Sequence, residues 1–181
     1  MIEDKVRAVI IKHLREQNEE FVPQKGAGPD IVKKGVALEV KGSGFDLNEA
    51  LKQLTRYAFT YAGLEVAFPV DAINLNFLHG LYFLERALES KGSLINRTVI
   101  NMYLVAKLDE EEYVVAEFGS VKILCERIVE KLSERVKVLF EEPDKAIGKV
   151  SPVICKIEQE ANEALKEYIK SGSALAYKVS L

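Results

Sequence analysis

Residues 25–57 read KGAGPDIVKKGVALEVKGSGFDLNEALKQLTRY, and the pattern of apolar and charged side chains in this stretch decides the expected fold. Residues 36–41 form a short apolar run that carries two charges, Glu39 and Lys41, two positions apart. Because side chains alternate between the two faces of a strand, both charges take one face and the apolar residues between them take the other. The run therefore predicts a strand that holds a carboxylate and an ammonium group side by side.

A second strand is expected just before it. Pro29 suits the first position of a strand, because proline has no backbone N–H to donate to a ladder. Residues 33–35, Lys-Lys-Gly, have the composition of a hairpin turn. Such a hairpin brings Asp30 near Glu39 on the same side, so that two carboxylates and Lys41 meet at one end of a sheet. Carboxylate oxygens of this kind suit Mg²⁺ or Mn²⁺.

A helix is expected after the hairpin, over residues 46–62. Residues 46–49, Asp-Leu-Asn-Glu, have the form of a capping box, and apolar residues recur behind them at steps of three and four. Gln53 and Tyr57 are four positions apart and so share one face of this helix.

The order of these residues resembles the PD-(D/E)XK nucleases, also called the restriction-endonuclease-like superfamily. The motif stands as Pro29-Asp30 and, after eight residues, Glu39-Val40-Lys41. Residues 53–57, Gln-Leu-Thr-Arg-Tyr, resemble the QxxxY motif of the RecB-like branch, which includes exonucleases and CRISPR-associated nucleases. The resemblance implies an α/β fold with a restriction-endonuclease-like core in the order helix, three strands, helix, strand.

The resemblance also implies an activity, the Mg²⁺- or Mn²⁺-dependent hydrolysis of DNA, as in repair or recombination. Asp30, Glu39 and the backbone carbonyl of Val40 would hold the metal, which lowers the pKa of a bound water and neutralises charge on the phosphate. Lys41 would orient or activate the attacking water. Gln53 and Tyr57 would help to position the substrate and the lysine.

Further candidates surround this site. Many members of the superfamily bring an additional acidic ligand from the first helix, here expected over residues 2–17, and Glu3 at the edge of its apolar stripe is the candidate. A solvated glutamate at a fraying helix end is the alternative for Glu3. Five basic residues would contact DNA or would form an ordinary solvated surface, namely Lys25, Lys33, Lys34, Lys52 and Arg56.

Length and composition bound the remaining possibilities. The 181 residues, 48% hydrophobic and 29% charged, can bury one sizeable core. Cys125 and Cys155 are too few for the four-cysteine cluster of some RecB-like nucleases or for a disulfide framework. We expect a cytoplasmic protein without a membrane partner, because there is no membrane-length apolar run and no signal peptide. The net charge of −3 does not by itself indicate a nucleic-acid binder.

The resemblance covers residues 1–70, the expected nuclease core. Residues 71–181 are expected to add a β-hairpin and helices that pack on the core as one compact unit. The expected elements are short strands at 21–23 and 65–70, a helix over 73–91 that could break at Gly80, hairpin strands at 98–107 and 113–118, helices over 120–141 and 151–170, and a strand over 174–179. The last two helices would cover the core or would form a homodimer interface.

Two other interpretations stay open. The first is a catalytically silent nuclease-fold protein that binds nucleic acid or a partner protein. The acidic net charge favours it, whereas retention of two carboxylates whose repulsion a metal relieves argues against it. The second is a coincidental motif in an unrelated α/β domain, with Glu39 and Lys41 on the solvated face of an edge strand. A long distance between Asp30 and Glu39 would favour this second interpretation.

Overall fold

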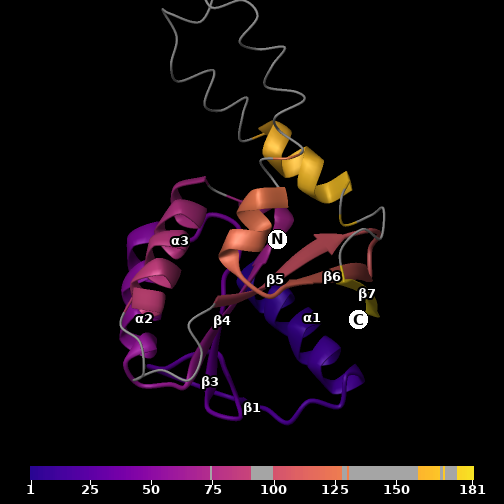
Figure 1. Ribbon diagram of the computed structural model, residues 1–181. Coiled ribbons are helices and arrows are strands. Elements are labelled where there is room, and N and C mark those ends of the chain that lie inside the picture. Colours follow the sequence, from indigo (N-terminus) through magenta and orange to yellow (C-terminus); the bar gives the residue numbers. More distant parts are fainter. Residues whose placement is uncertain (74, 91–99, 128–129, 131–158, 168, 170–174) are drawn as a thin grey trace, which may run out of the picture.

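The computed structural model describes residues 1–73, 75–90, 100–127, 130, 159–167, 169 and 175–181. Within these residues seven strands form one mixed sheet, whose spatial order is also the order along the chain (Figure 1). The strands are β1 (Val22–Pro23), β2 (Ile31–Lys33), β3 (Val36–Val40), β4 (Gly63–Pro69), β5 (Ile100–Lys107), β6 (Glu112–Phe118) and β7 (Leu175–Ser180). The helices are α1 (Glu3–Glu16), α2 (Leu47–Ala58), the 3-10 helix η1 (Val70–Ala72) and α3 (Leu75–Ser90), and residues 121–127 and 159–167 are also helical. The expected α/β class is confirmed.

The middle of the sheet is parallel. Strands β3, β4 and β5 run in the same direction, whereas β1-β2-β3 and β5-β6-β7 are antiparallel. Parallel neighbours need a crossover connection, and α2 provides the one between β3 and β4. The carboxyl ends of β3, β4 and β5 therefore meet at one edge of the sheet, the edge where α/β proteins commonly bind ligands.

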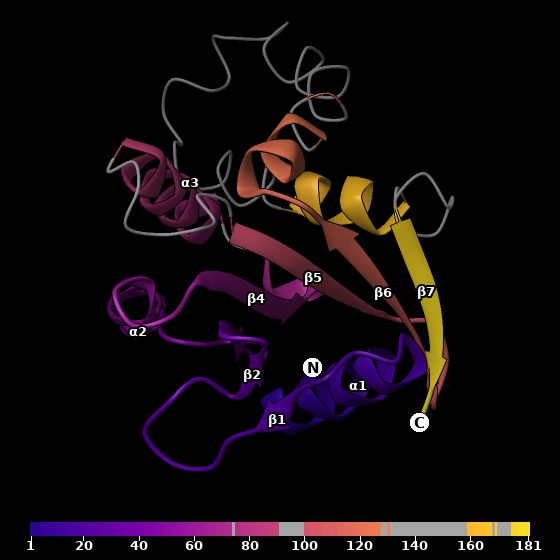
Figure 2. The ribbon, with the colours of Figure 1, turned by 60° about the horizontal axis from the view of Figure 1, so that its bottom comes forward.

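Helices cover both faces of the sheet (Figure 2). On one face lies α1, and the sheet curls around it, so that α1 contacts β3 and β4 as well as β6 and β7. Val6, Val9, Ile10 and Leu14 form the stripe that α1 buries there. Burial of each such side chain stabilises the fold by about 1.5–3 kcal/mol. On the other face lie α2, α3 and the helical residues 121–127 and 159–167, around a larger core.

The first 70 residues show the expected order of elements, namely one helix, three strands, one helix and one strand. The expected hairpin is also confirmed as β5 and β6, and it continues the same sheet rather than forming a separate layer. The final strand, β7, adds to β6. A single sheet therefore runs from the N-terminal elements through to the C-terminal strand.

The helix expected over residues 73–91 is confirmed as α3, and two details of the expected helices differ in the structure. The helix expected over residues 46–62 ends at Ala58. The helix α3 runs unbroken through Gly80, where a Cβ atom would lie 2.6 Å from Leu51 Cδ1 of α2. Gly80 therefore allows close packing of two helices instead of breaking one.

The expected helices over residues 120–141 and 151–170 fall only in part within the described residues. Ser120 begins the first one, and its Oγ accepts a hydrogen bond from the backbone N–H of Ile123 at 3.1 Å. Residues 131–158 lie outside the described part of the chain. None of the helices that the structure describes is both long and apolar enough to cross a membrane.

Candidate active site

The hairpin of β2 and β3 brings Asp30 to the carboxyl end of β3. Lys34 and Gly35 connect the strands with positive φ angles of 45° and 83°, as a two-residue turn of type I′ requires. The turn pairs Ile31 with Leu38, so Asp30 is next to the last residues of β3. The Asp30 Oδ2 atom accepts a hydrogen bond from the backbone N–H of Val40 at 2.9 Å. The sequence-based expectation that Asp30 lies near Glu39 is therefore met.

The backbone carbonyl of Val40 points to the side of β3 on which Asp30 lies. The N–H of Lys41 donates to the carbonyl of Ala67 in β4 at 2.8 Å. In a trans peptide the C=O and the next N–H point in opposite directions, so the Val40 carbonyl points away from β4, toward Asp30. A carboxylate and a carbonyl oxygen thus face one point beside β3.

Glu39 is buried although it is ionisable. Only 3% of the residue is exposed, and its Oε1 atom accepts a 2.6 Å hydrogen bond from Lys41 Nζ. The other oxygen, Oε2, has no hydrogen-bond partner among the described residues. Burial is the main cause of a raised pKa at Glu39, the charges of Asp30 and Glu3 raise this pKa further, and Lys41 opposes them.

This burial corrects one interpretation of the sequence. The hypothesis of a coincidental motif puts Glu39 and Lys41 on the solvated face of an edge strand. However, β3 is the third strand of the sheet, and every one of its residues is buried. The face that carries Glu39 is covered by α2. The Glu39 carboxylate therefore lies inside the protein, where an ionised carboxylate is costly without partners, and Lys41 beside it keeps 12% of its side chain exposed.

The helix α2 directs Gln53 and Tyr57 into the protein. The Asp46 side chain caps its first turn through a 2.9 Å hydrogen bond from the N–H of Glu49. Two buried atoms on this helix, Gln53 Oε1 and the Tyr57 hydroxyl, have no hydrogen-bond partner among the described residues. Burial raises the pKa of Tyr57, and the negative charges of Glu39 and Asp30 raise it further.

Three orphaned buried polar atoms thus belong to motif residues. Besides the Glu39 oxygen they are the Gln53 and Tyr57 oxygens on α2. Because buried polar groups in proteins are almost always hydrogen-bonded, these three atoms are available to a bound water, ion or ligand. The charges of Glu39 and Asp30 raise the pKa of Tyr57, so this tyrosine of α2 interacts electrostatically with the carboxylates at the end of β3.

Glu3 lies beside the site through a tight backbone contact. A Cβ atom on Gly42, which follows Lys41, would lie 2.5 Å from the backbone nitrogen of Glu3. The N-terminus of α1 is therefore pressed against the end of β3. Among the described residues no three His, Cys, Asp or Glu side chains have the geometry of a metal site. The ligands available at the end of β3 are two carboxylates and the Val40 carbonyl, which suffices for a cation such as Mg²⁺ that keeps several waters.

Arg7 is a site residue that the sequence did not reveal. Its Nη1 atom lies 3.3 Å from Asp30 Oδ1, and its Nη2 atom donates to the Asp30 carbonyl at 3.1 Å. The guanidinium holds Asp30 in place and offsets part of its charge. Arg7 is one helical turn from Glu3, but it is 23 residues from Asp30. A contact over this separation cannot be predicted from neighbouring residues in the sequence.

Lys33 and Lys34 lie away from the site. Lys33 is buried, and its Nζ atom contacts Glu19 at 2.8 Å, Glu65 at 3.1 Å and the Tyr103 hydroxyl at 2.8 Å. This cluster is at the opposite end of β3 from Glu39, next to the exposed Lys34 in the turn. The expectation that Lys33 contacts DNA is therefore wrong, because its charge is already neutralised inside the protein.

The other basic candidates, Lys25, Lys52 and Arg56, are exposed. Lys25 is exposed in the loop before Asp30, and Lys52 is exposed on α2. The Arg56 guanidinium lies 5.3 Å from the centre of the Tyr57 ring, where its charge acts against the raised pKa of that tyrosine. These three positions are compatible with a basic rim.

No family model matches the chain, and no curated protein or solved structure matches it significantly.

Proposed function

We propose that this protein is a metal-dependent DNA nuclease that hydrolyses phosphodiester bonds at the carboxyl end of β3. The observation that carries the proposal is the half-satisfied carboxylate of Glu39. It is buried, it is paired with Lys41 through one oxygen only, and it lies near a second carboxylate, Asp30. A divalent cation would satisfy the free Glu39 oxygen and would offset the repulsion between the two carboxylates.

A second buried glutamate in the neighbouring strand shows that burial alone does not leave oxygens unpaired. Glu65 of β4 is 2% exposed, and both of its oxygens are satisfied, one by Asn101 and the other by Lys33 and Tyr103. The fold can therefore neutralise a buried carboxylate completely. That it leaves Glu39 half-satisfied is what a functional carboxylate would require.

Each residue of the site would have a distinct part in the reaction. Asp30, Glu39 and the Val40 carbonyl would hold Mg²⁺ or Mn²⁺, which supplies a water of lowered pKa and neutralises charge on the phosphate. Lys41 would orient the attacking water or stabilise the pentavalent phosphate by its positive charge. The Tyr57 hydroxyl and the Gln53 amide would donate hydrogen bonds to the substrate or to Lys41. Glu3 would contribute to the metal through water.

The competing proposal is a nuclease-fold protein that binds nucleic acid or a partner without cutting. The Arg7–Asp30 ion pair favours it, because the guanidinium satisfies the carboxylate that a metal would otherwise need. The orphaned Glu39 oxygen speaks against it, since a binding module has no use for a buried unpaired carboxylate oxygen.

The test is cleavage of labelled single-stranded, duplex and branched DNA in Mg²⁺, Mn²⁺ or EDTA by the wild type, Glu39→Gln and Glu65→Gln. Glu65→Gln is the matched control, because it alters an equally buried glutamate one strand away. We expect metal-dependent cutting by the wild type and the control, and a loss of roughly 100-fold or more in Glu39→Gln. No cutting under any metal, or equal cutting by all three proteins, would overturn the proposal.

A further inference from the structure

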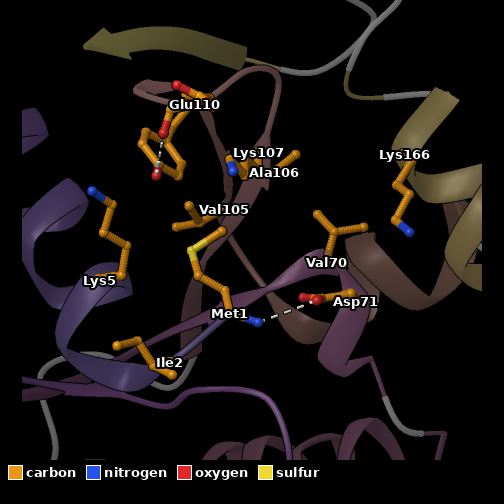
Figure 3. A pocket seen from close by; sticks show the side chains of 11 residues that line it. Met1, Ile2, Lys5, Val70, Asp71, Val105, Ala106, Lys107, Glu110 and Lys166 are labelled. Carbon is orange, nitrogen blue, oxygen red and sulfur yellow. Dashed lines mark hydrogen bonds and ion pairs between the residues drawn. The ribbon is translucent and has the colours of Figure 1, made fainter. Parts of the chain in front are cut away.

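A hollow of about 580 Å³ lies at the carboxyl edge of the parallel strands (Figure 3). Ile2, Val70 and Val105 give it apolar walls. Three lysines stand around it from three different parts of the chain, namely Lys5 of α1, Lys107 at the end of β5 and Lys166 in the helical residues 159–167. In Figure 3, Lys5 and Lys166 approach the hollow from opposite sides.

The hollow carries a surplus of positive charge. None of the three lysines forms an ion pair with another residue in the described ranges. Two acids, Asp71 and Glu110, also line the hollow, and Asp71 is paired with the amino group of Met1 at 3.2 Å. The hollow therefore suits an anion, with apolar walls for the uncharged part of the same ligand.

The hollow lies along the same edge of the sheet as the candidate active site. The segment that leads into α1 lines the hollow and also touches the chain just after Lys41, where the N–H of Ser43 donates to the Met1 carbonyl at 2.8 Å. The site lies at the end of β3, and the hollow lies at the ends of β4 and β5. Two strand spacings of about 4.8 Å put roughly 10 Å between them.

We infer that this hollow binds the phosphate backbone of the DNA strand a short distance from the bond that is cut. The inference rests on the proposed nuclease function and adds to it a direction for the substrate. The strand would run from the end of β3, past the N-terminus of α1, to the ends of β4 and β5. The three lysines would neutralise its phosphates, and the apolar walls would contact its sugars.

The test compares the wild type with a triple variant, Lys5→Gln, Lys107→Gln and Lys166→Gln, which removes charge and keeps much of each side chain. The matched control removes three exposed basic side chains elsewhere, with Arg15→Gln, Lys122→Gln and Lys178→Gln. Affinity for fluorescent single-stranded DNA is measured by anisotropy in EDTA over a range of salt concentrations. EDTA prevents cleavage, so this measurement reports binding alone.

Each phosphate contact on a single strand contributes about −0.7 to the slope of log affinity against log salt, so loss of three contacts should flatten the slope by about 2. Between 50 and 200 mM salt, the wild type should then lose about 16-fold more affinity than the triple variant. The control should behave as the wild type. An unchanged slope in the triple variant would overturn the inference even if the wild type cuts DNA. If the wild type neither binds nor cuts DNA, the proposed function fails, and the inference fails with it.

Discussion

Replacement of Gly42 by alanine should push the N-terminus of α1 away from the end of β3. The new Cβ would lie 2.5 Å from the Glu3 nitrogen, 3.0 Å from Glu3 Cα and 3.1 Å from the Ile2 carbonyl carbon. All three are backbone atoms, so no side-chain rotation relieves the clash. An ordinary contact of about 3.4 Å requires a shift of about 0.9 Å at the closest atom.

The cost of this overpacking is about 1–3 kcal/mol of unfolding free energy. For a protein of this length, that corresponds to a fall in the melting temperature of about 2–12 °C. Because Gly42 directly follows Lys41, the shift should also misplace the site, and a displacement of about 1 Å costs on the order of 100-fold in rate.

The assay is thermal unfolding followed by circular dichroism, together with cleavage under the best metal. Gly28→Ala is the control, because a Cβ atom at Gly28 meets nothing within 4 Å. Its melting temperature and its rate should stay close to those of the wild type. Equal melting temperatures for Gly42→Ala and Gly28→Ala would refute the close contact between β3 and α1.

Three further predictions follow from buried groups. Lys33→Met should lower the unfolding free energy by about 3–5 kcal/mol in urea denaturation, because it leaves the buried Glu65 without its cation. Lys34→Met, which changes an exposed neighbour, should leave the unfolding free energy nearly unchanged. A small loss of unfolding free energy in Lys33→Met would contradict the buried ion pair of Lys33 and Glu65. Tyr57→Phe removes a hydroxyl without a partner among the described residues, so it should leave urea stability unchanged and yet slow cleavage; a loss of stability would show that the hydroxyl is structural. In EDTA, the wild type should lose stability relative to Glu39→Gln as the pH rises above about 4.5, the usual glutamate pKa. Burial raises the pKa of Glu39 in the folded state, so ionisation of Glu39 favours unfolding. A difference in melting temperature between the two proteins that stays constant from pH 4.5 to 8 would argue against this burial.

Local sequence patterns predicted the elements that build the site. The alternation in residues 36–41, the Lys-Gly turn before it and the capped helix with Gln53 and Tyr57 all appear in the structure. These features depend on neighbours within a few positions, so a single sequence contains their signal. The hairpin turn alone fixes the register that places Asp30 beside Val40.

The contacts made by α1 could not be predicted in this way. Arg7 reaches Asp30, and Glu3 packs against Gly42, only because α1 docks across the sheet from far along the chain. The position of Lys33 did have a signal, since alternation puts it on the same face as Ile31, and that face is buried. A lysine is usually a surface residue, so the positive charge of Lys33 led to the expectation of an exposed side chain.

The burial of β3 was also missed for a physical reason. Strands that are buried on both faces normally read as continuous apolar runs, and Glu39 breaks that rule. A residue that breaks a local rule is expected at functional sites, where the fold accepts a local cost.

Calorimetric titration with Mn²⁺ measures whether Asp30 and Glu39 hold a divalent metal, because it detects binding without a substrate. The wild type and Glu65→Gln should each bind Mn²⁺ saturably. Glu39→Gln should bind at least about tenfold more weakly, which is a loss of about 1.4 kcal/mol or more. Saturable binding that is equally tight in Glu39→Gln, or no binding by the wild type, would show that these carboxylates do not hold the metal.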